Sequence, residues 1–430
     1  MDALDQTHDV RLRSWVESAN SPTGDFPVQN LPFGVFRPRG GVPTIGVAIG
    51  DEILDLRQSG ERGLLDGLSS ALRAATEAST LNPLMALGRG AAAILRQRIS
   101  KILAADGWGA DPRLLTPAAD AELQVPATIG NYSDFYASIH HARNVGKLFR
   151  PDQPLLPNYR HVPIAYHGRS SSIVVSGTRV RRPSGQMKGS GDVPVFRPSG
   201  RLDYEAEVGC FCGPGNALGE PIPIDAAESH LFGLCLVNDW SARDIQAWEY
   251  QPLGPFLGKS FATTLSPWVV TSEALAPFRC PAVQRATDDP QPLAYLSSRS
   301  NEASGGFDVT VEVLLRSAEM RRAGVAPVLL SQSSLREMYW TLAQMVAHHT
   351  SNGCNLMPGD LIATGTLSGS TRGSQGSLIE ITEGGTVPLQ LPNGESRTFL
   401  EDGDEIIMRA FCERPGRARI GFGECAGIIT

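Results

Sequence analysis

The stretch Leu231–Asn238 reads Leu-Phe-Gly-Leu-Cys-Leu-Val-Asn and is almost continuously apolar. A run of this kind and length predicts a β-strand that is buried on both of its faces. The run ends at Asp239, and a carboxylate at the end of a buried strand is costly to bury without a partner. The sequence therefore predicts a strand inside the core with an acidic side chain at its end.

The chain around this strand is also typical of β structure. It contains 45 glycines and 31 prolines in 430 residues, an excess that favours a turn-rich, mainly β protein over a helical bundle. Short apolar runs separated by Gly and Pro at 33–36, 46–50 and 53–56 predict a small barrel or meander near the N-terminus. Residues 64–103 instead have apolar positions at helical spacing.

These patterns predict two domains, residues 1–124 and residues 125–430. In the second domain, short β-like runs alternate with turns, and few helices are expected. The stretch 281–306, rich in Asp, Pro, Ser and Asn, predicts a surface loop. The helices predicted in the second domain are at about 134–145, 241–250 and 335–349.

Charge and cysteine content exclude several classes of protein. Lys and Arg number 38 and Asp and Glu 45, giving a net charge of −7, whereas a nucleic-acid-binding protein usually has a basic excess. The seven cysteines form no C-x-x-C pair, which favours buried free thiols in a reducing compartment. The acidic start Met1–Asp5 is unlike a secretory signal, and no apolar run approaches the ~18 residues of a membrane span. We therefore expect a cytoplasmic protein that binds neither nucleic acid nor a membrane.

The common motifs of phosphate binding, nucleophilic catalysis and zinc binding are missing. Residues 254–260, Gly-Pro-Phe-Leu-Gly-Lys-Ser, approach the P-loop pattern but have three residues between the two glycines instead of four. No G-x-S-x-G or H-E-x-x-H sequence occurs. A catalytic site in this chain must therefore be built from other residues.

Acidic residues instead occur where apolar ones are expected. Residues 201–211 have the pattern of a strand, and Glu205 and Glu207, two positions apart, face the same side of it. Two carboxylates so near to each other raise each other's pKa unless a cation lies between them. A solvated sheet face with alternating charges is the alternative interpretation of this pair.

Two further acids precede predicted helices. A helix that begins at Asp239 would carry Arg243, Gln246 and Tyr250 on one face, at intervals of four, seven and eleven residues. The alternative for this acid is an N-cap aspartate with a simple ion pair to the arginine.

Asp134 would head a second helix, with His141 two turns later on the same face, although it could also be a simple cap beside a structural histidine. Together with Glu205, Glu207 and Asp239 it would offer only hard oxygen ligands. Such ligands suit Ca²⁺ or Mg²⁺ and not zinc.

Six motifs occur along the chain: Asn131–Tyr136 with His141, Tyr166–Arg169, Asp203–Glu207, Asn238–Gln246, Gly254–Ser260 and Pro358–Thr366. In sequence and order, they resemble those of the fumarylacetoacetate hydrolase family. The resemblance covers about residues 25–430, and it implies an N-terminal SH3-like barrel, a C-terminal mixed β-roll with a few helices, and a homodimer.

The resemblance also implies an activity. A protein of this kind would be a divalent-metal-dependent hydrolase that cleaves a carbon–carbon bond of 4-fumarylacetoacetate, giving fumarate and acetoacetate. This reaction would be the last step of tyrosine and phenylalanine catabolism. The expected partner is therefore a small diketo-diacid substrate.

Site residues follow from the same resemblance. The implied calcium ligands are Asp134, Glu205, Glu207 and Asp239, and the implied magnesium site involves Asp239, Lys259 and Thr263. Substrate contacts are implied for Tyr136, Arg150, Tyr166, Arg243, Gln246, Tyr250 and Thr366. The general base falls on His141 and its orienting glutamate on Glu380.

These roles give a mechanistic hypothesis. His141 takes a proton from water, which attacks the carbonyl carbon. Arg243, Gln246 and Lys259 stabilise the oxyanion, and the metal stabilises the carbanion leaving group.

Two alternatives remain at this point. One is a related acylpyruvate hydrolase or β-keto-acid decarboxylase of the same superfamily, which would share the two glutamates and the downstream aspartate. The other is a non-catalytic protein whose fold is stabilised by the metal, although such a protein would not need both His141 and Glu380.

Overall fold

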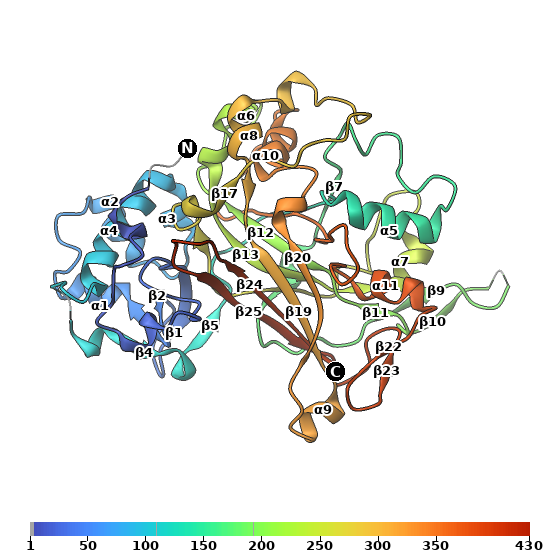
Figure 1. Ribbon diagram of the computed structural model, residues 1–430, viewed down its shortest axis with the longest axis horizontal. Helices are drawn as coiled ribbons and strands as arrows, with labels where there is room; N and C mark the ends of the chain where they lie inside the picture. Colours follow the sequence, from blue (N-terminus) through green and yellow to red (C-terminus); the bar gives the residue numbers. More distant parts are fainter. Residues whose placement is uncertain (1–3, 109, 192) are drawn as a thin grey trace.

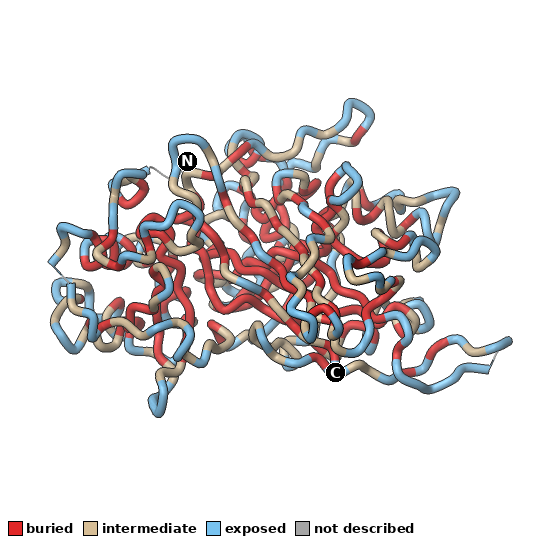
Figure 2. Tube along the Cα trace, turned by 60° about the horizontal axis from the view of Figure 1, so that its bottom comes forward, coloured by how far each residue is buried: buried red, intermediate tan, exposed pale blue. Residues whose placement is uncertain are grey.

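The computed structural model describes residues 4–108, 110–191 and 193–430. It confirms a mainly β protein, with a five-stranded N-terminal sheet and its helices at one side of the molecule and sheets of eight and four strands in the centre (Figure 1). Buried residues concentrate in the strands of these sheets, whereas the outer loops are mostly exposed (Figure 2). Eleven α-helices occur among the described residues, and only α4 and α5 are longer than nine residues.

The N-terminal sheet is an antiparallel meander in which the fifth strand returns to the free edge of the first, giving the order β4-β3-β2-β1-β5. Its strands are β1 (Phe33–Arg37), β2 (Thr44–Ile49), β3 (Glu52–Asp55), β4 (Leu115–Pro117) and β5 (Glu122–Gln124). The accompanying helices are α1 (Leu56–Glu61), α2 (Ser70–Thr76), α3 (Asn82–Ala86) and α4 (Gly88–Leu103). The helical spacing expected in 64–103 is present in α4, where Leu95, Ile99 and Ile102 are buried.

The central sheet is mixed and has the order β7-β6-β21-β12-β13-β15-β8, with β16 paired to β13. Its longest strand, β13 (Leu231–Asp239), is buried at all nine positions, which confirms the first prediction from the sequence. The other strands are β6 (Tyr132–Phe135), β7 (Ala165–His167), β8 (Ile173–Val175), β12 (Ala206–Cys212), β15 (Thr263–Leu265), β16 (Val270–Thr271) and β21 (Leu361–Ala363).

Strand β13 is apolar up to Val237 because both of its faces are covered. Leu234 and Leu236 belong to the main core of the C-terminal part, whereas Cys235 and Val237 belong to an apolar cluster that includes Phe33 of the N-terminal sheet. Successive side chains of a strand point to opposite faces, so the two clusters lie on opposite sides of β13. The division into domains at residue 124 stays a proposal.

A second large sheet is antiparallel, with the order β20-β19-β24-β25. Its strands are β19 (Thr310–Arg316), β20 (Val328–Ser334), β24 (Glu405–Cys412) and β25 (Ile420–Ile428). Short two-stranded ladders pair β9 (Ser184–Met187) with β10 (Val195–Pro198), β11 (Leu202–Asp203) with β14 (Ser241–Ala242), β17 (Arg279–Cys280) with β18 (Gly306–Phe307), and β22 (Leu389–Gln390) with β23 (Ser396–Arg397). The remaining helices are α5 (Ile139–Phe149), α6 (Ile224–Ala227), α7 (Arg243–Glu249), α8 (Arg299–Ser304), α9 (Ala318–Arg322), α10 (Leu342–Thr350) and α11 (Leu378–Ile381).

Two predicted helix starts were wrong. Asp134 lies in strand β6, where it pairs with Ala363 and Tyr166 on the two flanking strands. The helix begins only after Ser138, whose side chain accepts a hydrogen bond from the backbone of His141. Asp239 likewise remains in β13 because Thr263 pairs with it, and α7 follows after the short strand β14. The predicted helical faces that begin at these two acids do not exist.

Two other expectations also need correction. The helix predicted at 335–349 starts at Leu342, because Thr341 and Gln344 form a capping box there. The surface loop predicted at 281–306 contains α8, and its Leu296 is buried. The helices of the C-terminal part are therefore more numerous and shorter than the sequence pattern indicates.

All seven cysteines are free, as expected, and six are buried, with Cys354 half-buried. Among the described residues, none of the helices combines the length and apolar composition that crossing a bilayer requires.

Candidate active site

Three acidic side chains from neighbouring strands of the central sheet meet at one point. Asp134 comes from β6, Glu207 from β12 and Asp239 from the last position of β13. One carboxylate oxygen of each lies within 4.8 Å of one from each of the others. We call these three residues the acidic triad.

The triad lies on a face of the sheet that is otherwise apolar. The alternation of side chains places Asp134 on the same face as Tyr132, Glu207 on that of Phe211, and Asp239 on that of Val237. These three neighbours belong to the apolar cluster shared with the N-terminal sheet. The acids are therefore withdrawn from water, and each is at most 2% exposed.

Much of the hydrogen-bonding capacity of the triad is unused. Neither carboxylate oxygen of Glu207, nor Oδ1 of Asp134, has a hydrogen-bond partner in the part of the chain that the structure describes. Burial, followed by the charge of Asp239, raises the pKa of Asp134 to about 8. Burial and the charges of Asp134 and Asp239 raise the pKa of Glu207 well above its usual range. Without an added cation, this cluster of carboxylates is electrostatically unfavourable.

A divalent cation fits the triad. Buried charges in proteins are paired or coordinate metals, and the unpartnered oxygens supply hard ligands of the kind that Ca²⁺ and Mg²⁺ prefer. Asp239 is also held in place, because its Oδ1 accepts a hydrogen bond from Thr263 Oγ1 (2.9 Å) and its Oδ2 accepts one from Tyr166 (2.6 Å). The structure therefore contains a buried acidic site that could hold a metal ion.

A second group of charged residues, Glu205, Arg243 and Lys259, lies beside the triad. Both carboxylate oxygens of Glu205 accept hydrogen bonds from cationic side chains. Glu205 Oε1 accepts a hydrogen bond from Arg243 Nη1 (2.7 Å), and Oε2 accepts one from Lys259. Lys259 also donates to Asp239 Oδ2 (2.8 Å) and so links this group to the triad. Burial alone would raise the pKa of Glu205, but the charges of Lys259 and Arg243 outweigh it and hold the pKa below its usual value.

This pairing bears on the predicted metal ligands. Glu205 is occupied by two cations of the protein, so its expected place in a calcium shell stays a prediction. Lys259 and Thr263, expected near a magnesium ion, both donate to the carboxylate of Asp239.

The predicted histidine–glutamate pair is present in the structure. His141 Nδ1 lies 2.7 Å from Oε2 of Glu380, and both side chains are buried. Glu380 accepts three more hydrogen bonds, from Ser377 (2.6 Å) and Ser368 (2.9 Å) on Oε2 and from Asn144 (2.9 Å) on Oε1. Burial raises the pKa of Glu380, but His141, Ser377 and Asn144 outweigh burial and lower it.

A cavity of about 460 Å³ connects these groups. Most of the predicted site residues line it, and its remaining wall is largely apolar, with Val145, Phe149 and Ile164 among the lining residues. Glu207, Asp239, Thr263 and Glu380 lie behind the wall rather than in it. The predicted residues that line the cavity are Asp134, Tyr136, His141, Arg150, Tyr166, Glu205, Arg243, Gln246, Tyr250, Lys259 and Thr366.

Sequence reasoning missed the residues that support this site from behind. Ser368, Ser377 and Asn144 received no role, although Asn144 follows His141 by three residues on α5 and so faces the same way. Asp203 was quoted only as part of a motif, yet it is completely buried and contacts Arg243. A charged residue at an apolar strand position is the signal that could have identified Asp203.

Family comparisons agree with this arrangement. Residues 29–126 match the family model described as fumarylacetoacetase N-terminal, and residues 131–429 match the model described as fumarylacetoacetate (FAA) hydrolase C-terminal. The chain belongs to the fumarylacetoacetate hydrolase family.

Relatives within this family are similar over almost their whole length. The fumarylacetoacetase of Oryza sativa subsp. japonica is 47% identical over 430 residues, which covers 97% of this chain and 97% of the relative. The fumarylacetoacetase of Bos taurus is 49% identical over 415 residues, covering 94% and 96% respectively. The solved structure of a fumarylacetoacetate hydrolase from psychrophilic Exiguobacterium antarcticum has a TM-score of 0.52 at 18% identity, covers 93% of this chain and 99% of that chain, and shares the fold.

Proposed function

We propose that this member of the fumarylacetoacetate hydrolase family hydrolyses a carbon–carbon bond of 4-fumarylacetoacetate to give fumarate and acetoacetate. The observation that supports it best is that His141, backed by Glu380, and Asp134 of the acidic triad border the same cavity. Relatives that are 44–49% identical over nearly the whole chain are named fumarylacetoacetase.

The proposed general base is His141. A carboxylate can only accept hydrogen bonds, so the contact with Glu380 requires the proton of the neutral imidazole to lie on Nδ1. The Nε2 atom is then free of a proton and can take one from water in the cavity. Glu380 already accepts hydrogen bonds from Ser368, Ser377 and Asn144, so it would stabilise the imidazolium without taking its proton.

The proposed oxyanion site consists of Arg243, Gln246 and Lys259, all of which line the cavity. Burial lowers the pKa of Lys259, but the charges of Asp239 and Glu205 outweigh burial and raise it, so Lys259 stays charged at neutral pH. Arg243 Nη1 donates to Oε1 of Gln246 (3.2 Å), which orients the amide so that its NH₂ group can serve as a donor. Charged and amide donors of this kind stabilise the tetrahedral oxyanion formed when water attacks the fumaryl carbonyl.

The carbon–carbon bond then breaks, and its electron pair passes to the methylene carbon of the acetoacetyl part. The proton that His141 took from water passes to this carbon, and the new carboxyl group releases the second proton of the water to solvent. Fumarate and acetoacetate then leave, and the histidine is neutral again. A divalent cation held by Asp134, Glu207 and Asp239 would supply positive charge that stabilises the acetoacetyl oxygens as negative charge develops.

The remaining cavity residues are proposed to orient the substrate. Arg150 contributes a positive charge at the C-terminal end of α5, where it would attract one of the two substrate carboxylates. Hydroxyl groups for hydrogen bonds to the substrate are offered by Tyr136, Tyr166, Tyr250 and Thr366.

Several finer properties belong to the same proposal. We propose Ca²⁺ or Mg²⁺ as the cation, a homodimer, two domains that divide at residue 124, a cytoplasmic location and a role in the last step of tyrosine and phenylalanine catabolism. Metal analysis of the purified protein tests the cation, and sedimentation equilibrium tests the dimer. Separate expression of residues 1–124 tests the domain boundary, and cell fractionation tests the location.

The activity is tested by following the ultraviolet absorbance of the diketone, with and without a chelator. We expect the absorbance to fall only when metal is present, with equal amounts of fumarate and acetoacetate released. Release of pyruvate or CO₂ from an alternative substrate, with fumarylacetoacetate unchanged, would instead indicate an acylpyruvate hydrolase or a decarboxylase. No turnover of any diketone by metal-loaded protein would contradict the proposed function.

A further inference from the structure

Asp203 is a completely buried carboxylate that lies outside the cavity wall. It ends β11, a two-residue strand that pairs antiparallel with β14, so that Asp203 lies opposite Ser241. A buried carboxylate requires several donors to compensate for the loss of water. Asp203 has them, and they come from two different parts of the proposed active site.

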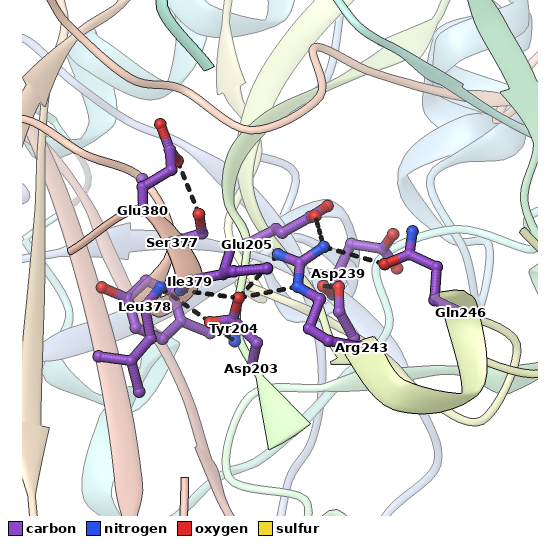
Figure 3. Close-up of polar contacts among 12 residues, drawn as sticks. Asp203, Tyr204, Glu205, Asp239, Arg243, Gln246, Ser377, Leu378, Ile379 and Glu380 are labelled. Atoms are coloured by element: carbon purple, nitrogen blue, oxygen red, sulfur yellow. Dashed lines mark hydrogen bonds and ion pairs between the residues drawn. The ribbon is translucent and has the colours of Figure 1, made fainter. Parts of the chain in front are cut away.

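The first donor is the Arg243 side chain, which follows directly after β14. Its Nε donates to Asp203 Oδ2 at 2.9 Å, and its Nη2 lies 2.8 Å from the same oxygen (Figure 3). On the opposite edge, Nη1 of this guanidinium donates to Glu205. Asp203 and Glu205 thus hold the guanidinium from two sides, which fixes its plane and its distance from the cavity.

The second set of donors lies at the start of α11, the short helix that carries Glu380. The backbone N–H groups of Leu378 and Ile379 donate to Asp203 at 2.8 Å and 3.1 Å (Figure 3). The same segment is held by a bridge between Glu205 and Ser377 and by a backbone hydrogen bond from Ala206 to Gly376 (2.9 Å). The position of Glu380 behind His141 therefore depends on the segment that Asp203 holds.

We propose that Asp203 is a positioning residue for the reaction: its one carboxylate sets both the Arg243 guanidinium and the α11 segment that places Glu380 behind His141. This inference rests on the proposed function, because it assigns Asp203 a task in that reaction. Asp203 does not touch the substrate. It fixes the distance between the Arg243 guanidinium, which stabilises the oxyanion, and the His141–Glu380 pair, which activates water.

Only a carboxylate satisfies all of these donors. An asparagine in the same place keeps the volume but has one accepting oxygen. Its NH₂ group would therefore face either Arg243 and the Ile379 N–H, which both donate to Oδ2, or the Leu378 N–H, which donates to Oδ1. In either orientation one of the two supported elements must move. A displacement of about 1 Å in a catalytic group can lower a rate by about 10²-fold.

The test compares Asp203→Asn with a matched control, Asp404→Asn. Asp404 is also buried and accepts hydrogen bonds from an arginine, Arg397 (2.8 and 3.0 Å), and from the backbone of Glu401 (2.9 Å). Unlike Arg243, however, Arg397 does not line the cavity. Both variants should lower the melting temperature. Assayed well below their melting temperatures and per folded molecule, Asp203→Asn should lower kcat by about 10²–10³-fold with little change in KM, whereas Asp404→Asn should keep kcat near wild type.

A purely structural role for Asp203 would give the same result for both variants, with reduced stability and unchanged kcat per folded molecule. This outcome would overturn the proposal. If Asp203→Asn does not fold, Asp203→Glu and Asp404→Glu form the replacement pair, since both retain the charge and add one methylene. A lowered kcat for Asp203→Glu alone supports the proposal, and an unchanged kcat contradicts it.

Double-mutant cycles identify the groups through which Asp203 acts. Asp203→Asn should cost less in kcat when combined with Arg243→Gln or Glu380→Gln than it costs alone, because part of its target is already gone. Full additivity in both cycles would overturn the proposal. Failure of the proposed function is distinguishable, because in that case the wild-type protein itself turns over no diketone.

Discussion

The acidic triad lies close to the pair Asp203 and Glu205 in the fold, and Glu205 and Glu207 are only two residues apart in the sequence. The two groups nevertheless differ in whether cationic side chains compensate their charge. Asp203 and Glu205 are each bonded to Arg243, and Glu205 is bonded to Lys259 as well. Glu207, only two residues later, has two buried oxygens for which the described residues provide no donor. The same residue type is therefore compensated within the protein at one position and left uncompensated at the next.

This difference separates two uses of buried charge. A carboxylate with internal cations is a fixed part of the scaffold, and here two such carboxylates hold the Arg243 guanidinium. A cluster without enough internal cations is stable only if a cation from solution joins it or if some of its members take up protons. Lys259 lies at the boundary, because it donates to Glu205 of the paired group and to Asp239 of the triad.

The largest expected effect comes from a residue that belongs to neither group. His141→Ala should lower turnover by about 10²–10⁴-fold, because the proton acceptor for water is removed. Its metal content should be unchanged, since no member of the triad contacts this histidine in the described hydrogen bonds. Steady-state kinetics and metal analysis of the same sample test both parts. A variant with near-wild-type turnover would show that another group is the base.

Glu207→Gln tests the uncompensated group. This substitution removes one negative charge but keeps the shape, so the variant should bind a divalent cation more weakly than the wild type. The loss should exceed the about 10–100-fold that removal of an outer partner of a metal ligand costs. Isothermal titration with Ca²⁺ and with Mg²⁺ measures it. Unchanged affinity of Glu207→Gln would show that the metal is bound elsewhere.

Asp239→Ala should lose the bound metal altogether.

The pH dependence of stability should differ between the metal-free and the metal-bound protein. In the metal-free fold the pKa of Asp134 is about 8, above its ordinary value of 3.8, so the folded state keeps a proton that the unfolded chain has lost between these pH values. The contribution of this proton to the free energy of unfolding is therefore complete below about pH 4. It falls as the pH rises towards 8, by about 1.4 kcal/mol per pH unit for each such proton.

Urea unfolding at several pH values, with a chelator and with saturating metal, tests this dependence. Metal should reduce the slope, because the bound cation favours the ionised carboxylates. A metal-free protein whose stability increases from pH 5 to pH 8 would contradict the account of the triad.

The smallest expected effect comes from Ser377, which donates a hydrogen bond to Glu380 beside His141. Ser377→Ala removes one of the four hydrogen bonds that Glu380 accepts and leaves the other three. Loss of a single hydrogen bond to a charged group costs about 1.5–3 kcal/mol at most in stability, and its effect on turnover should be close to tenfold or less. Kinetics of Ser368→Ala should give a similar value. A loss as large as that of His141→Ala would mean that the serine takes a direct part in the chemistry.

Several features of the site could be predicted from the sequence because they follow from local patterns. The apolar run before Asp239 indicates a buried strand with a carboxylate at its end, and the structure confirms this strand. The motifs around His141 and Glu205 gave residues that line one cavity in the structure. Wrong predictions arose where pairing with a distant strand outweighs local propensity, as for Asp134, which is held in β6 by β7 and β21.

The sequence by itself determined which chemical groups are available: carboxylates at apolar positions, a histidine, and the cations Arg243 and Lys259. Only the tertiary structure decided which carboxylate receives a cation. Arg243 reaches Asp203 because β11 and β14 pair, and Lys259 reaches Glu205 and Asp239 across 54 and 20 residues of sequence. Electrostatic interactions depend on distance and burial rather than on separation along the chain, so the difference between Glu205 and Glu207 arises only when the sheets assemble.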